Sequence, residues 1–351
     1  MSNDSKRMSA YSLLFEELEE SLVNMGHEKW RASQVWQWLY GGKADGWDNM
    51  ANLPKALRTD LADSMNALDE TAKHVETAQE GGGTSKLLLR MQDGELVETV
   101  VIPSRGRRTV CVSSQVGCAF GCAFCASGMS GVVRNLESGE IVAQAMRAMR
   151  AEGVRPNNIV FMGMGEPFAN YDNALRAAHI LNDNRGLGVG ARRITFSTCG
   201  VVPGINRLAG EGMQFELSVS LHAPSQELRE QIMPVARRWG IDELMEACRS
   251  YTAVTNRIIT FEYTLIQGFN DGTEHARKLI ELLKNLKCRV NLIPLNPVDE
   301  FGGEAPTEAV CEKFLQTIER SGINATLRRS KGRGVDASCG QLRRRRIARQ
   351  M

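Results

Sequence analysis

The chain has 351 residues, of which 42% are hydrophobic and 24% are charged, and its formal net charge is +2. This composition is ordinary for a soluble globular protein and leaves room for one large domain and a small one. No stretch approaches 18 apolar residues, which excludes a transmembrane helix, and the first residues lack the apolar core of a secretory signal. Nine cysteines without the spacing of a secreted disulfide framework favour a reducing cytoplasm.

Residues 1–80 are expected to form a small helical accessory domain. Apolar side chains recur at helical spacing in two runs, one at Leu14, Phe15, Leu18 and Leu22 and one at Val35, Trp36, Leu39 and Tyr40. Gly41 is expected to end the second helix. The stretch from Lys29 to Trp38 mixes bases with aromatics, a pattern that suits RNA binding and helix packing equally well.

Residues 81–108 are expected to hold a linker at Gly81–Gly83 and a β-hairpin extension. Lys86–Met91 and Glu95–Ile102 are strand-like and flank Gln92-Asp93-Gly94, a typical hairpin turn.

From residue 109 to 330, strand and helix patterns alternate. The predicted strands are Thr109–Ser114, Asn158–Met162, Arg193–Ser197, Phe215–Ser220, Ile258–Leu265, Arg289–Ile293 and Ala325–Arg328. Helical patterns between them include Ser138–Ala151, Thr273–Leu286 and Thr307–Ser321. About six β–α units predict an α/β protein with a parallel sheet, and the pattern alone does not choose between a barrel and an open sheet.

Cys118, Cys122 and Cys125 lie in the run Cys-x3-Cys-x2-Cys. Three thiolates at this spacing can hold three corners of an iron–sulfur cube, whereas a cluster used only for electron transfer usually has four cysteines. An iron without a protein ligand suggests that a small molecule binds the metal. A structural zinc knuckle is the alternative, but no fourth Cys or His lies nearby.

Polar and glycine-rich motifs follow several predicted strands. They are Gly163-Met-Gly165-Glu166-Pro167, Ser197-Thr-Cys199-Gly200, Ser220-Leu221-His222 and Leu295-Asn296-Pro297. In parallel α/β architectures the chemistry sits at the carboxyl ends of the strands. One such motif carries little weight, but repetition at four strand ends indicates a binding site.

The final segment is basic. Nine Arg or Lys residues against one acid lie between Leu327 and Met351, including Arg343 to Arg346. A basic tail is often only a solvated end, but this one surrounds Cys339 and therefore favours a polyanionic substrate such as nucleic acid.

With these motifs in view, the sequence resembles the RlmN/Cfr family of radical S-adenosylmethionine enzymes, which methylate adenine in RNA. The resemblance runs from about residue 29 to 342. Besides the cysteine run, it rests on Cys111-Val-Ser-Ser-Gln-Val-Gly-Cys118, Arg134-Asn-Leu, Gly163-Met-Gly-Glu-Pro167, Ser220-Leu-His-Ala-Pro224, Ile232-Met-Pro234 and Asp336-Ala-Ser-Cys339-Gly-Gln-Leu342. Cys199, Ala236 and the loop 126–131 differ from what is usual in the family.

The resemblance implies a partial (β/α)6 barrel over residues 109–330, preceded by the accessory domain and followed by a C-terminal segment, 331–351. It implies a 4Fe-4S cluster on Cys118, Cys122 and Cys125. It further implies that S-adenosylmethionine, two molecules per turnover, binds among Gly165, Glu166, Ser197, Ser220, Leu221, His222 and Asn296.

The resemblance also assigns three catalytic residues. Cys339 is expected to become S-methylated, Cys111 to resolve the reaction by forming a disulfide with it, and Glu98 to accept a proton. Carbons 2 and 8 of adenine carry no lone pair to attack a sulfonium methyl, so radical chemistry from a cofactor is needed. Cys199, Cys248, Cys288 and Cys311 are expected to be inert.

The implied substrates are 23S ribosomal RNA, methylated at adenine carbon 2 in the peptidyl-transferase centre, and transfer RNA, at the adenine 3′ of the anticodon. An electron donor such as flavodoxin or ferredoxin, no membrane partner, a monomer and a cytoplasmic location are also expected. Three alternatives stay open: a C8 methyltransferase that confers antibiotic resistance, a radical enzyme with a non-RNA substrate, and a silent RNA-binding protein with a structural cluster.

Overall fold

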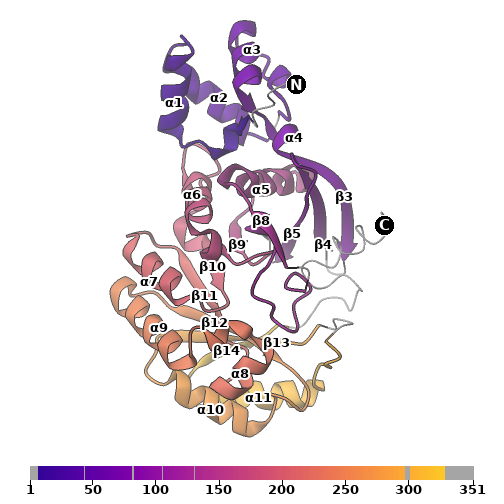
Figure 1. Cartoon of the computed structure of the whole chain (residues 1–351), viewed down its shortest axis with the longest axis vertical. Coiled ribbons are helices and arrows are strands. Elements are labelled where there is room, and N and C mark those ends of the chain that lie inside the picture. The colour runs from indigo at the N-terminus through magenta and orange to yellow at the C-terminus, as the bar shows by residue number, and fades with distance from the viewer. Residues whose placement is uncertain are drawn as a thin grey trace.

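The computed structural model describes residues 7–42, 44–80, 83–104, 106–129, 131–296 and 301–328. Cys339, the segment 331–351 and its basic tail lie outside the described residues. The accessory part contains a two-stranded parallel ribbon and four helices, drawn in indigo and violet in Figure 1: β1 Met8–Ser9, α1 Phe15–Asn24, α2 Arg31–Tyr40, α3 Lys55–Ser64, β2 Met65–Asn66 and α4 Leu68–Thr71.

The two apolar runs of the accessory part form helices as predicted. Phe15, Leu18 and Leu22 are buried on α1, and they pack with the buried face of α2. Phe15 and Trp36 meet edge to face with ring centroids 5.4 Å apart. Gly41 caps the C-terminus of α2, as expected.

A single ten-stranded sheet forms the rest of the framework. Its order is β14-β13-β12-β11-β10-β9-β6-β5-β4-β3, so β14 and β3 are its edges in the described part of the chain. The strands are β3 Ala72–Glu80, β4 Thr84–Met91, β5 Leu96–Ser104, β6 Arg107–Cys111, β9 Asn158–Phe161, β10 Ile194–Thr198, β11 Glu216–Ser220, β12 Ile259–Leu265, β13 Cys288–Pro294 and β14 Asn324–Leu327. From β6 through β14 all neighbours are parallel, while β3, β4, β5 and β6 pair antiparallel.

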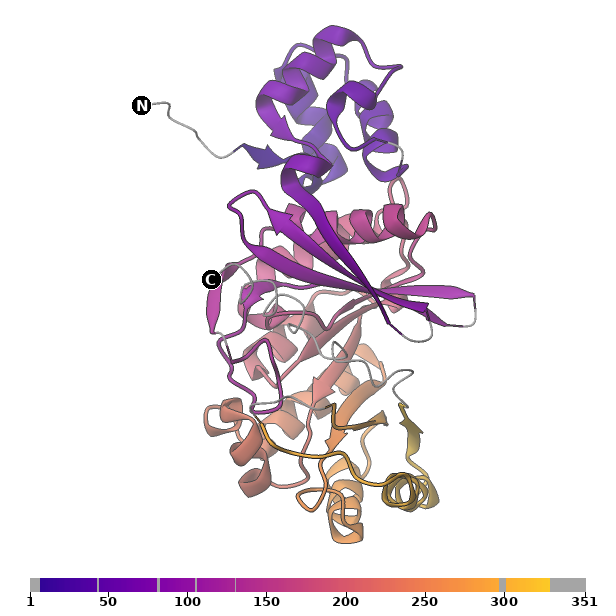
Figure 2. The same cartoon turned by 90° about the vertical axis from the view of Figure 1, so that its right-hand side faces the viewer.

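Helices follow the parallel strands and cover one side of the sheet. They are α5 Ser138–Glu152, α6 Tyr171–Asn182, α7 Val202–Gly210, α8 Gln226–Ile232, α9 Ile241–Thr255, α10 Thr273–Leu283 and α11 Glu308–Arg320. Figure 2 shows α5 lying across one side of the ribbon of β3, β4 and β5, which continues the parallel sheet. No helix in the described ranges is long and apolar enough to cross a membrane.

Side chains alternate between the two faces of the parallel strands. On the helix-covered face, Phe161 stacks on Phe196 at 4.7 Å, and Tyr263 packs against Phe314 of α11 at 5.4 Å. The opposite face is polar because Ser218, Glu262 and Asn291 occupy the alternate positions, joined by hydrogen bonds of 2.9 and 3.0 Å to Glu262 Oε1.

The predicted parallel strands and the β4–β5 hairpin are confirmed, with every end within three residues of its predicted position. The turn closes with Gly94 at φ 89°. One prediction is wrong: residues 72–80 were assigned to the helical domain but form β3, which pairs with β4. β3 is an edge strand with several partly exposed polar residues, so it lacks the apolar run that marked the inner strands. Gly83 accordingly lies in the connection between two paired strands, rather than in an interdomain linker.

Candidate active site

The cysteine loop begins and ends at a small antiparallel ribbon of β7 Gln115–Gly117 and β8 Val132–Asn135. The Cys118 amide donates to Gly131 O at 2.9 Å at the base of the loop. Gly117 has φ 81°, and a Cβ there would collide with the Gly131 carbonyl oxygen. Only glycine therefore suits the position before the first cysteine of the run.

Two contacts fasten the loop to the segment that follows β11. The Ala123 amide donates to Ile232 O, at the end of α8, over 2.9 Å. The Phe124 ring meets the His222 ring edge to face at 4.8 Å. The sequence motifs around Ile232 and His222 thus contact the cysteine loop directly.

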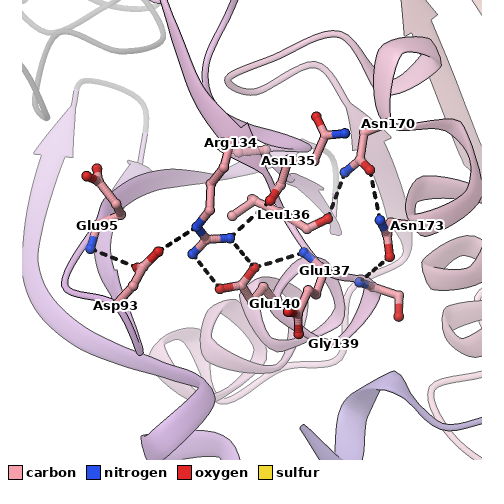
Figure 3. A network of polar contacts seen from close by, with 12 residues as sticks. Asp93, Glu95, Arg134, Asn135, Leu136, Glu137, Gly139, Glu140, Asn170 and Asn173 are labelled. Atoms are coloured by element: carbon pink, nitrogen blue, oxygen red, sulfur yellow. Dashed lines mark hydrogen bonds and ion pairs between the residues drawn. The ribbon is translucent and has the colours of Figure 1, made fainter. Parts of the chain in front are cut away.

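Arg134 on β8 fastens the returning strand of the loop (Figure 3). Its guanidinium donates to Asp93 Oδ2 at 2.5 Å and makes a two-point contact with the Glu140 carboxylate at 2.7 and 2.8 Å. Paired bonds of this kind are directional as well as strong. Arg134 therefore ties the cysteine loop both to the β4–β5 turn and to the first turn of α5.

The three cysteines of the loop supply the donor set of an iron–sulfur cluster that leaves one iron without a protein ligand. In the described ranges no three His, Cys, Asp or Glu side chains are gathered around one point. A cube does not require that, because each thiolate binds a different iron. The pKa of Cys118 is raised to about 12, mainly by burial, while a hydrogen bond from the Phe120 backbone opposes the shift and the charges of Cys125 and Glu166 add to it. Cys118, Cys122 and Cys125 would hold the group, with loss of their protons on binding.

The Gly163–Pro167 turn packs against the segment between β6 and the cysteine loop. Ser113 Oγ accepts from the Met164 amide at 2.9 Å and donates to Glu98 O at 2.7 Å. Gly165 has φ 95°, and a Cβ there would lie 2.5 Å from Gln115 Cβ. The glycine is needed because two backbone segments approach closely at this point.

Glu166 joins this turn to the next strand end. Its carboxylate accepts from the Phe168 amide at 3.0 Å and from the Cys199 amide at 2.7 Å, and its side chain is buried. Burial raises the pKa of Glu166, while these two backbone hydrogen bonds lower it. A buried carboxylate beside the cysteine loop is suited to an ammonium group of a ligand.

The other residues predicted around S-adenosylmethionine lie at neighbouring strand ends. Ser197 is near the end of β10, Ser220 ends β11, and Asn296 follows β13 by two residues. Because β9 to β13 are adjacent and parallel, their carboxyl ends form one edge, where Glu166 and His222 also lie. The predicted set is therefore brought together, and Leu221 within it is fully buried.

His222 is held in an unusual backbone conformation with φ 57°. Its Nδ1 accepts from the Thr264 amide at 3.0 Å, and its carbonyl accepts from Asn270 Nδ2 at 2.7 Å. Burial, aided by the charge of Arg229, lowers the pKa of His222 to about 3. The ring is therefore neutral near pH 7, and its remaining proton is on Nε2, where it can be donated.

Glu98 and Cys111 lie on one face of the sheet. Cys111 is opposite Val100 in the β5–β6 pair, so Glu98 is its diagonal neighbour. Both side chains are buried. Lys86 on β4 shares this face, and its Nζ lies 3.5 Å from Glu98 Oε2 with both side chains 2% exposed.

The remaining cysteines are consistent with inert thiols. Burial raises the pKa of Cys248 to about 12 and that of Cys288 to about 11, and it also raises the pKa values of Cys199 and Cys311. No disulfide joins two of the described cysteines. The disulfide that Cys111 is expected to form during turnover involves Cys339, which lies outside the described residues.

Comparison with known proteins defines the class. Residues 112–283 match the Radical SAM superfamily, and residues 11–66 match the Ribosomal RNA large subunit methyltransferase N-terminal domain. The crystal structure of a radical SAM methyltransferase from Sphaerobacter thermophilus superposes with a TM-score of 0.91 at 47% identity, covering 95% of this chain and 98% of that chain. The chain is a radical SAM enzyme with the predicted α/β fold and N-terminal domain, and its superfamily implies an iron–sulfur cluster and S-adenosylmethionine.

Two relatives identify the family within that class. The probable dual-specificity RNA methyltransferase RlmN of Staphylococcus haemolyticus is 46% identical over 343 residues, which is 97% of this chain and 94% of the relative. The equivalent protein of Halalkalibacterium halodurans is 46% identical over 338 residues, 95% of this chain and 93% of the relative. The chain belongs to the RlmN family of radical SAM methyltransferases.

Two buried cations of this region were not predicted from the sequence. They are Lys86, beside Glu98, and Arg229, beside the ends of β10 and β11. Lys86 is at an inward position of a strand and Arg229 within a short helix, and neither belongs to a recognisable motif. Only the strand register and the packing of α8 bring them to the site.

Proposed function

We propose that the protein methylates carbon 2 of an adenine in the peptidyl-transferase centre of 23S ribosomal RNA. Transfer RNA, at the adenine 3′ of the anticodon, is its second substrate. The RNA methyltransferase names of its relatives and the match of residues 11–66 support an RNA substrate. The observation that carries the proposal is the shared buried face of Glu98 and Cys111, the latter at the end of the strand that precedes the cysteine loop.

Cys118, Cys122 and Cys125 would hold a 4Fe-4S cluster, which would supply the electron for radical chemistry on S-adenosylmethionine. The residues at the strand ends then have binding roles. The Glu166 carboxylate binds the amino group of the cofactor, and the Nε2–H group of His222 donates a hydrogen bond to an acceptor atom of the cofactor. The neutral state of His222 supports this role because Nδ1 is already an acceptor for Thr264.

The protein's own sulfur carries the methyl group in this proposal. Cys339 would first take a methyl group from one S-adenosylmethionine, and a radical derived from a second would remove one hydrogen atom from it. The methylene carbon would then bond to adenine carbon 2. Loss of the ring proton to Glu98 and of one electron to the oxidised cluster would leave a thioether between this carbon and the Cys339 sulfur. The Cys111 thiolate would attack that sulfur and break its bond to the methylene carbon, which would take up a proton to complete the methyl group. The disulfide that remains would be reduced by cytoplasmic thiols.

The environment of Glu98 supports its role as proton acceptor. Lys86, whose Nζ lies 3.5 Å from Glu98 Oε2, is as deeply buried as the carboxylate, so the pair interacts with little screening by water. Ser113 connects the Glu98 backbone to the Gly163–Pro167 turn through Met164. These two hydrogen bonds link the Glu98 backbone to the turn that contains Glu166.

The accessory domain offers one feature suited to RNA. Trp30 is 54% exposed, and the Arg31 guanidinium lies 4.0 Å from the centre of its ring, whereas Trp36 of the same stretch is buried in the core. An exposed aromatic with an adjacent cation can stack on a base and contact phosphate. The mixed stretch from Lys29 to Trp38 thus divides into a packing part and an exposed part.

The test is mass spectrometry of nucleosides from RNA incubated anaerobically with the reconstituted enzyme, S-adenosylmethionine and a reductant. The proposal predicts 2-methyladenosine with the parent chain and with Cys288→Ala, a matched control at the far end of β13. Cys339→Ala should give none. Formation of 8-methyladenosine would assign the protein to the other regiochemistry, and deoxyadenosine without any methylated adenosine would exclude the RNA substrate.

A further inference from the structure

Arg229 is a fully buried cation at the centre of the site. It lies on α8, three residues before Ile232, whose carbonyl holds the cysteine loop through Ala123. Its residue exposure is 0%. An arginine is almost never found at this depth unless something compensates its charge.

Among the described residues, the side-chain hydrogen bonds of Arg229 go only to neutral carbonyl groups at strand ends. Nη2 donates to Cys199 O at 2.6 Å and to Ser220 O at 3.4 Å, and Nε donates to Leu221 O at 3.2 Å. Nη1 is buried and has no hydrogen-bond partner within the part of the chain that the structure describes. The guanidinium is oriented by the backbone but not neutralised by it.

The cysteine run lies against the elements that hold Arg229. The amide of Ala123, which lies between two of the loop cysteines, donates to Ile232 O at the end of the helix that carries Arg229. The Phe124 ring of the same run meets His222, whose preceding residue accepts a hydrogen bond from the guanidinium. The buried guanidinium therefore lies beside the place where the three cysteines would hold their cluster.

An unpaired charge that is removed from water destabilises the folded protein. Gly200, at φ 109°, leaves room for the guanidinium, because a Cβ there would lie 2.9 Å from Nη2. The fold thus keeps a place for a cation that the described residues do not neutralise. Such a place is explained when the missing negative charge arrives with a bound group.

We propose that Arg229 is the fixed counter-charge of the iron–sulfur cluster held by Cys118, Cys122 and Cys125, and that it raises the reduction potential of this cluster. The inference rests on the cluster in the proposed function. Thiolates and cluster sulfides make the group anionic, and reduction adds a further negative charge, which a nearby fixed cation favours. Arg229 does not contact the substrate in this proposal; its charge acts on the cluster, and the cluster acts on the cofactor.

The test compares the reconstituted parent enzyme with Arg229→Gln and Arg229→Lys. Iron content and the midpoint potential of the cluster are measured without S-adenosylmethionine, the potential by an EPR-monitored redox titration. Arg229→Gln should shift the midpoint to a more negative value, and Arg229→Lys should shift it less. Arg249→Gln, a half-exposed arginine on α9, is the matched control and should not shift it.

Each result decides the inference. If iron-loaded Arg229→Gln has the same midpoint potential as the parent, the inference is overturned. If that variant also binds S-adenosylmethionine more weakly, the positive charge of Arg229 is assigned to the carboxylate of the cofactor instead. A parent protein that takes up no iron fails the proposed function instead. If Arg229→Gln does not fold, Cys248→Asp introduces a carboxylate near Arg229; it should give the same negative shift, and an unchanged midpoint overturns the inference.

Discussion

The two faces of the parallel sheet differ in composition and in purpose. On the helix-covered face, alternate residues of each strand are apolar and buried, among them Phe161, Phe196 and Phe261. On the other face, the residues between them are polar, including Ser218, Glu262 and Asn291. Neighbouring residues of one strand, such as Phe261 and Glu262, thus serve different purposes.

This division separates stability from chemistry. Burial of apolar area on the helix side supplies the folding free energy. The polar face and the strand ends can then hold charged groups, such as Glu166 and Arg229, that the core could not accept. A substitution on one face should therefore change the stability of the fold, and a substitution on the other should change the site.

The largest effect is expected from the cysteine loop. Cys122→Ala should lose iron after reconstitution and all methyl transfer, because two thiolates cannot hold the cube in place of three. Iron analysis and the visible spectrum of the cluster measure this. Cys311→Ala, a buried thiol on α11, should bind iron normally; full iron content in Cys122→Ala would disprove the ligand assignment.

Glu98→Gln should lower turnover by roughly 10²–10⁴-fold, the usual contribution of a positioned base. The RNA product should be measured in single turnovers well below the unfolding temperature, since Lys86 also loses its carboxylate partner. Iron content should stay at the parent value. Glu76→Gln, on the edge strand β3, is the control, and equal turnover of both variants would exclude Glu98 as the proton acceptor.

Phe261→Ala tests the helix-covered face. Removal of this fully buried ring should lower the free energy of unfolding by about 3–5 kcal/mol. Urea unfolding measures the loss. Its neighbour Glu262→Gln keeps the side-chain shape on the polar face and should cost only about 1 kcal/mol; equal losses for the two variants would contradict the division of the sheet.

The pH dependence of stability should contain a contribution from His222. Its folded-state pKa of about 3 lies below the unfolded value of 6.5, so the unfolded chain binds the extra proton between these pH values. Stability therefore rises with pH across this window and is lost on acidification, by roughly 2 kcal/mol between pH 7 and 5. Urea unfolding of the cluster-free chain at both pH values measures it. His222→Gln should show a smaller loss than the parent, and identical losses would contradict the low pKa of His222.

The framework could be predicted well from the sequence, because its inner strands are either apolar throughout or alternate regularly between apolar and polar residues. β12 and β13 were predicted to within a residue of their observed ends. The edge strand β3 was missed because its residues 73, 74, 76 and 79 are polar and only one edge is paired. Its pattern carried too little apolar character to be distinguished from the helices before it.

The site residues that lie in short motifs, such as Cys118, Glu166 and His222, could be predicted. The buried cations that accompany them could not. Lys86 and Arg229 are polar residues that a sequence pattern assigns to the surface, and their burial depends on strand register and on the packing of a short helix. The closeness of Glu98 and Cys111 likewise follows from the β5–β6 register.

The central claim is that a sulfur of the protein passes the methyl carbon to RNA as a methylene group. It is tested most directly with S-adenosylmethionine whose methyl carries three deuterium atoms, followed by mass spectrometry of the methylated adenosine. The mechanism predicts a product that retains two deuterium atoms, because one is removed by the radical before the carbon reaches adenine. A product that retains all three would show direct transfer of an intact methyl group and would contradict the account.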